Sequence, residues 1–215
     1  NVGMGYLLNG ASILSQTLNF TPEGGQGGKV IIQGLQGAEF GAATSVTLSG
    51  GSSLLTETFG VTDGGQVVVT SKSLTMDGVG QEGNSTTITS SAIDVGRGGN
   101  VEVNVQQARL LDGATIRSEV GTSDPTAQPG PTLTVQGVQG MGSIAVAVDL
   151  LGGGSGITGI ISNTGGSVNS GDIAVYAETV TMADGAVIQG GTLVSNGAAG
   201  SVIIEADSVN ISGGS

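Results

Sequence analysis

The residue types that this chain lacks limit the chemistry that it could carry. None of its 215 residues is His or Cys, which excludes a Ser-His triad, a thiol nucleophile and a zinc site. Carboxylates are plentiful, with 17 Asp and Glu against five basic residues. The basic residues lie scattered through the sequence: Lys29, Lys72, Arg97, Arg109 and Arg117. Because no cluster of Asp with Arg is visible, we predict that the chain is not an enzyme and has no catalytic or cofactor-binding residues.

Arg117 and Glu119 are the candidate pair of opposite charges. They lie two residues apart beside an apolar alternation, so on a β-strand both side chains would point the same way. The ordinary interpretation is a surface ion pair, which contributes about 0–1 kcal/mol. Catalytic use of clustered Asp and Arg, as in a carbohydrate-active β-helix enzyme of the polysaccharide lyase or hydrolase kind, is the alternative.

Asp77, Asp112 and Asp184 are the candidate metal ligands. Each precedes a Gly, and we expect the three to occupy equivalent turns, where stacked carboxylates could bind calcium. The three glycines at 152–154 would interrupt that column. Asp-Gly is also common turn chemistry, and we favour this interpretation, so no metal site is predicted.

An internal repeat positions these residues. Six times, an apolar residue is followed 13 to 17 residues later by the start of another apolar alternation, across a stretch rich in Gly, Ser, Thr and Asn. The first members are Ile13, Leu54, Ile88, Ile116, Ile160 and Ile188, and the second members are Val30, Val67, Val101, Leu133, Ile173 and Val202. Second members recur every 29 to 40 residues, a period typical of a solenoid or a propeller.

Three short alternating segments in each repeat favour a solenoid. Propeller blades need four antiparallel strands, and this chain has no Trp. We therefore predict an all-β fold, a right-handed parallel β-helix with three sheets, about five full coils and partial coils at both ends. Inward columns of Val and Ile would form its core, and Gly would supply positive φ at its corners. Excursions are expected at residues 33–43, 76–85 and 124–131. Residues 1–215 are expected to form a single domain, a fragment or stacking unit of a longer rod.

The charge limits the partners. A net charge of −12 argues against nucleic acid and against an anionic membrane surface. The most apolar stretch, residues 144–161, contains Asp149 and five glycines, so we predict no membrane span. A threonine ladder suggests ice binding, with Thr56, Thr58, Thr87, Thr89, Thr115 and Thr164 as its members. The equivalent positions also hold Glu57, Arg117, Glu119 and Asn163, which interrupt its regularity.

Three turn units carry a resemblance to a known family. One motif is a turn, then Gly-Ala, an inward Ile and often Ser, and it occurs at residues 9–15, 112–118 and 184–190. A second motif, Ile/Val-Gln-Gly-Leu/Val-Gln-Gly, occurs at residues 32–37 and 135–140. The chain resembles the repetitive passenger of filamentous-haemagglutinin-like exoproteins, the secreted partners of two-partner secretion systems. The resemblance implies a Gram-negative bacterium, an outer-membrane transporter during secretion, and an extracellular or cell-surface location.

These expectations define the function to be tested. We predict a non-enzymatic structural or adhesive rod, either a passenger segment of a surface adhesin or a filament building block. The rods are expected to associate end to end or laterally. They are also expected to contact a receptor on a host cell, a surface or a glycan. Sequons at Asn19, Asn84 and Asn210 leave glycosylation open.

Overall fold

The computed structural model describes residues 2–19, 27–35, 37–60, 63–78, 83–93, 96, 98–121, 131–165, 169–192 and 197–213. These residues form an all-β structure with one short 3₁₀ helix. The elements in chain order are β1 (Met4–Leu7), β2 (Ser12–Asn19), β3 (Lys29–Ile32), η1 (Glu39–Gly41), β4 (Ala43–Ser49), β5 (Ser53–Gly60), β6 (Gln66–Asp77), β7 (Thr87–Ala92), β8 (Val101–Leu111), β9 (Thr115–Val120), β10 (Thr132–Gln136), β11 (Ala145–Leu151), β12 (Gly159–Thr164), β13 (Asp172–Ala183), β14 (Val187–Thr192) and β15 (Val202–Ile211).

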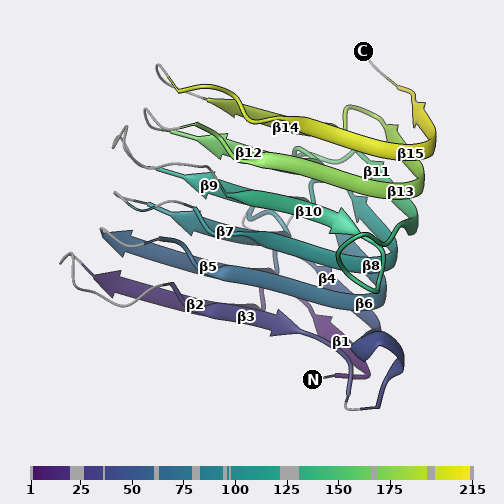
Figure 1. Ribbon diagram of the computed structural model, residues 1–215, viewed down its shortest axis with the longest axis horizontal. Helices are drawn as coiled ribbons and strands as arrows, with labels where there is room; N and C mark the ends of the chain where they lie inside the picture. The colour runs from purple at the N-terminus through teal and green to yellow at the C-terminus, as the bar shows by residue number, and fades with distance from the viewer. Residues whose placement is uncertain are drawn as a thin grey trace.

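The strands form two parallel sheets. Sheet B has the order β14-β12-β9-β7-β5-β2, and sheet A contains the other nine strands of the described residues. Strands that are neighbours in a sheet are about one repeat apart in sequence, because the chain visits sheet A and sheet B in turn. In Figure 1 the strands of sheet B lie one above the other, from β2 near the N-terminus to β14 near the C-terminus. This stacking is compatible with a β-solenoid.

The predicted register of the two apolar columns is confirmed. In sheet B, each first member pairs with the next along the stack: Ile13 with Leu54, Leu54 with Ile88, Ile88 with Ile116, Ile116 with Ile160, and Ile160 with Ile188. The second members pair in the same way through sheet A, from Val30 to Val202. Spacing in the sequence therefore located both columns without error.

The first two strands predicted in each coil are continuous wherever no loop separates them. Strands β6, β8, β13 and β15 each run through both predicted segments, which is why two sheets are present. The burial alternation slips once inside the long strands: both Gln106 and Gln107 of β8 point outward, and so do Lys72 and Ser73 of β6. Two outward residues in succession shift the alternation by one and indicate a bend in these strands.

Two loops interrupt this long strand at the same place. Between β3 and β4, and again between β10 and β11, the chain leaves the sheet and returns to equivalent positions, Ala43 and Ala145. Each loop begins in the motif shared by residues 32–37 and 135–140. The necks are closed by Gly34 N–H donating to Gly41 O (2.7 Å) and by Gly137 N–H donating to Ser143 O (3.0 Å). The excursion expected at 33–43 is thus confirmed for its described residues. The expected excursion at 124–131 lies, except for Pro131, outside the described residues.

The core is formed by the inward columns. Leu54, Ile88, Ile116 and Ile160 have no exposed surface, and each contributes roughly 1.5–3 kcal/mol by burial. Ile13 is 38% exposed because it lies in the first coil. Among the described residues, no helix is long and apolar enough to cross a membrane; the apolar stretch at 144–161 forms β11 and the start of β12.

A column of glycines lines the corner where the chain passes from sheet B to sheet A. Gly65, Gly99, Gly171 and Gly200 each lie two residues before a second member of the repeat. A Cβ on Gly99 would overlap the carbonyl oxygen of Gly65, and one on Gly200 would overlap that of Gly171. None of these four has a positive φ. The expectation that corner glycines supply positive φ is therefore wrong at this corner, where close approach of the coils requires them.

Candidate binding groove on sheet B

The three calcium candidates do not form one column. Asp77 pairs with Leu111, so it stands one position before Asp112, and the prediction that all three occupy equivalent turns is wrong for Asp77. Asp112 and Asp184 are equivalent, but Gly152 lies between them in the stack, which puts them two coils, or about 10 Å, apart. Within the described part of the chain, no group of three or more acidic side chains lies close enough to hold a metal ion.

Asp112 and Asp184 instead shape tight turns. Their φ angles are 48° and 54°, in the left-handed region, and the following Gly113 and Gly185 are also positive. Ala114 N–H donates to Leu111 O, and Ala186 N–H donates to Ala183 O, at 3.0 and 3.1 Å. Asp and Asn tolerate this conformation better than other residues with a side chain. Turn geometry is sufficient to explain both aspartates.

The basic residues lie apart from one another. Arg109 and Asp149 are neighbours across β8 and β11 at 3.9 Å, and Lys72 pairs with Glu39 at 2.7 Å. Both pairs are substantially exposed. Glycoside hydrolysis generally needs two carboxylates about 5–9.5 Å apart, whereas each of these pairs supplies one. Arg97 lies outside the described residues, and Lys29 is exposed in β3.

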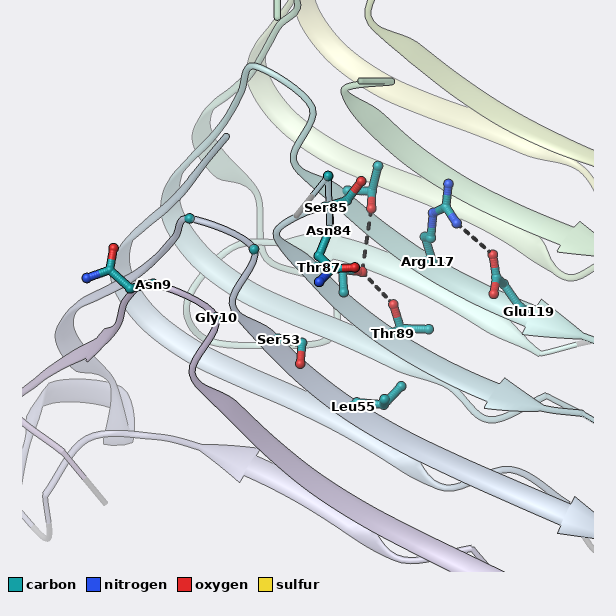
Figure 2. A pocket seen from close by; sticks show the side chains of 14 residues that line it. Asn9, Gly10, Ser53, Leu55, Asn84, Ser85, Thr87, Thr89, Arg117 and Glu119 are labelled. Atoms are coloured by element: carbon teal, nitrogen blue, oxygen red, sulfur yellow. Dashed lines mark hydrogen bonds and ion pairs between the residues drawn. The ribbon is translucent and has the colours of Figure 1, made fainter. Parts of the chain in front are cut away.

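Arg117 and Glu119 form the ion pair that their spacing predicts. Arg117 Nη1 donates to Glu119 Oε1 at 3.0 Å on the outward face of β9. The two side chains are 32% and 40% exposed, so the pair is open to a ligand on one side. Figure 2 shows the pair at one end of a groove that crosses β5, β7 and β9.

The groove has a polar floor that is bordered by loop segments of successive coils. Its volume is about 980 Å³. The floor consists of outward side chains from three successive coils: Ser53, Leu55, Thr87, Thr89, Thr115, Arg117 and Glu119. Its walls are the segments that precede β2, β5 and β7: Asn9 with Gly10, Gly50 with Gly51, and residues 83–85, which include Asn84. The excursion predicted at 76–85 therefore borders the groove, although residues 79–82 lie outside the described part.

The threonine hydroxyls of the floor are already ordered. Thr87 and Thr89 are linked through their hydroxyls at 2.5 Å, and Thr115 Oγ1 donates to Thr87 Oγ1 at 3.5 Å. Figure 2 shows Thr87 and Thr89 pointing toward one another on the floor of the groove. Thr89 and Thr115 are buried, at 6% and 1% exposure, so the half-buried Thr87 is the one of these three threonines whose hydroxyl a ligand can reach.

Arg117 occupies its position at an energetic cost. Its Nε is buried and has no hydrogen-bond partner, and an unsatisfied buried donor costs about 1–3 kcal/mol. The flanking positions of the same outward column carry Thr89 and Ile161, and neither side chain has a guanidinium donor that needs an acceptor. Asn163, the neighbour of Glu119 in β12, also has a buried Oδ1 without a partner. Packing alone does not explain a charged side chain here.

A second hollow lies on sheet A beside the loop 137–144. Its volume is about 630 Å³, and it is lined by Glu102, Gln136 and Tyr176 among others. Gln136 Nε2 donates to Asn104 Oδ1 (2.9 Å) and to Glu102 Oε1 (3.3 Å). The polar side chains of Glu102, Asn104 and Gln136 are thus linked to one another beside this hollow.

The sequons differ in their surroundings. Asn84 is exposed in the groove wall. Asn210 is exposed on β15, where its Nδ2 donates to Ser208 Oγ at 3.4 Å. The side chain of Asn19 lies outside the described residues.

The groove itself was not predicted from the sequence. The sequence indicates Arg117, Glu119 and the threonines for separate reasons, and the walls come from loop segments that it does not relate to them. No protein-family model, curated protein or solved structure matches this chain.

Proposed function

We propose that this chain is a right-handed parallel β-helix that serves as a non-enzymatic, extracellular structural and adhesive rod. The observation that carries the proposal is the contrast between its two kinds of positions. The inward columns repeat in register through successive coils, whereas the outward positions vary from coil to coil. Repetition of this kind serves stacking, and a variable exterior suits contact with a surface.

Two physical arguments support the three-faced, right-handed form. The bend at Gln106 and Gln107 divides sheet A into two faces, and sheet B supplies a third. Connections between parallel strands of one sheet are right-handed in about 98% of cases, and every strand pairing described is parallel and separated by a full coil. A cryo-electron microscopy or crystal structure that shows a left-handed winding would contradict the proposal.

We further propose secretion as a filamentous-haemagglutinin-like passenger, through an outer-membrane transporter to the surface of a Gram-negative bacterium. The shared turn units support this, because Asn9, Asp112 and Asp184 occupy the same position of the coil. A net charge of −12 with few charged side chains suits an exposed rod that must remain soluble. Association end to end or side by side is part of the proposal.

Electron microscopy of the native secreted material tests the rod. Thin fibres with a regular cross-section are expected, and cells that display them should adhere to a surface or to one another more than cells from which the gene is deleted. Compact particles from the full-length native protein would refute the rod. Fibres on cells that adhere no better than the deletion strain would leave structure as the function and refute adhesion.

A further inference from the structure

We propose that the groove on sheet B binds a neutral oligosaccharide and that Arg117 and Glu119 hydrogen-bond to its hydroxyl groups. The inference rests on the adhesive part of the proposed function, since it names the class of ligand that an adhesive surface of this rod would recognise.

The floor of the groove offers the mixture of groups that sugar hydroxyls require. A hydroxyl both donates and accepts, so its partners must do both. The half-buried Thr87 supplies a hydroxyl, the Arg117 guanidinium supplies donors, and the Glu119 carboxylate supplies acceptors. These groups lie on two neighbouring coils, about 4.8 Å apart, and Asn84 faces them from the wall. A ligand that spans the coils would meet several polar groups at once.

The charge of the groove favours a neutral ligand. Glu119 already pairs with the guanidinium at 3.0 Å, so the floor presents no unbalanced positive charge. The chain as a whole carries −12, which disfavours an anionic saccharide or a phosphate. A cation would meet a single carboxylate that an arginine occupies, a weak arrangement for calcium.

Other classes of ligand fit less well. Leu55 is the one large apolar side chain among the lining residues described, so an amphipathic helix would bury little surface. An extended peptide would need an open strand edge, whereas the central strands here are paired on both sides. Leu55 is sufficient to contact the C–H face of one sugar ring.

Arg117 is also the residue whose presence stacking does not explain. Its Nε lacks an acceptor, and its column neighbours include an isoleucine, Ile161. A residue that opposes stability and lies in a groove is a candidate for function. Replacement of Arg117 by leucine therefore separates the two roles: the stack keeps its packing, and the ligand loses its donors.

The test compares Arg117→Leu with Arg109→Leu. Arg109 is the matched control because it is an outward arginine beside a carboxylate, Asp149, on the other sheet. Isothermal titration of the purified 215-residue chain would use tetrasaccharides of glucose and of N-acetylglucosamine as neutral probes, and of galacturonate as an acidic probe. We expect a neutral probe to bind, with affinity at least tenfold weaker in Arg117→Leu and unchanged in Arg109→Leu. The melting temperature of Arg117→Leu should equal or exceed that of the wild type.

A second variant, Glu119→Gln, tests whether the ligand uses the carboxylate. It replaces the charged acceptor and removes the countercharge of Arg117, so the affinity for a neutral probe that hydrogen-bonds to the carboxylate should fall. Preference of the wild type for the acidic probe, no binding of any probe, or equal affinity in wild type and Arg117→Leu would each overturn the proposal. The rod is judged separately, because fibres of Arg117→Leu should be indistinguishable from wild type by microscopy. Normal fibres without sugar binding would refute this inference alone.

Discussion

The buried hydroxyl of Ser118 donates a 3.0 Å hydrogen bond to the carbonyl oxygen of Gly99, which lies in the corner one coil earlier. Ser90 makes the equivalent bond to Gly65 at 2.8 Å. Ser162 is the next serine in this column, but the position equivalent to Gly99 in its coil is Pro131, and the Ser162 hydroxyl has no partner. The coil of Ser162 therefore lacks a polar link that the two preceding coils possess.

We expect Ser118→Ala and Ser162→Ala to differ in sign or size. Loss of the Ser118 hydroxyl leaves the buried Gly99 carbonyl without this donor and should lower the free energy of unfolding by about 1–3 kcal/mol. Loss of the Ser162 hydroxyl removes a group that has no partner, so stability should stay unchanged or rise by about 1 kcal/mol. Urea unfolding of both variants measures the difference, and equal destabilisation would contradict the assigned bonding.

Gly99→Ala should destabilise the stack because the added Cβ meets backbone. It would overlap the Gly65 carbonyl and the Ser90 hydroxyl, and overpacking against groups that cannot move costs about 1–3 kcal/mol or more. Gly165→Ala is the control, since a Cβ there meets nothing within 4 Å and the φ angle is not positive. Thermal unfolding should show a lower melting temperature for Gly99→Ala only.

Asp112 should act as a turn residue and not as a calcium ligand. Asp112→Asn should keep the stability within about 0.5 kcal/mol, because Asn9 adopts the same conformation at the same position. Asp112→Val places a β-branched residue at a φ of 48° and should cost about 1–3 kcal/mol. A wild-type melting temperature that rises with added calcium, falls with chelator, and does neither in Asp112→Asn would contradict this.

Ile116→Asp should prevent stable folding. Ile116 is fully buried between Ile88 and Ile160, and a buried unpaired carboxylate costs more than about 4 kcal/mol. Ile157→Asp provides the comparison, because Ile157 is 57% exposed. Circular dichroism should show loss of the β signal for Ile116→Asp and a normal spectrum for Ile157→Asp. Native-like unfolding of Ile116→Asp would show that its side chain does not face the core.

Much of the fold could be predicted because stacking imposes one rule on every coil. The spacing from Ile116 to Leu133 identifies a third strand and the first strand of the next coil, and both residues fall in the expected columns. The union of the first two strands was missed, since no Gly or Pro marks the bend. The signal was present as two adjacent polar residues, Gln106 and Gln107, which shift the alternation by one.

The candidate site was less accessible from the sequence. The Arg117–Glu119 pair follows from strand geometry, but the groove depends on turns at Gly10 and Gly50 and on the segment at 83–85, whose positions only the stacked coils define. Asp77 was placed one residue out, because a Gly after Asp also occurs at the end of a strand. An Asp-Gly pair indicates that the chain turns there, but it does not show which residues of the neighbouring coils lie beside it.

The two loops that begin in the shared Gln-Gly motif leave the sheet at one corner, and both return to it in register although they differ in length. The corner thus works as an insertion point: a segment can be enlarged, shortened or replaced there while the coils above and below keep their pairing. Variants of this chain could present different surface loops by exchanging residues 33–42 and 137–144. The strand pairing of the coils would stay the same. Grafting of foreign peptides into either loop offers a way to use the stacked sheets as a display scaffold.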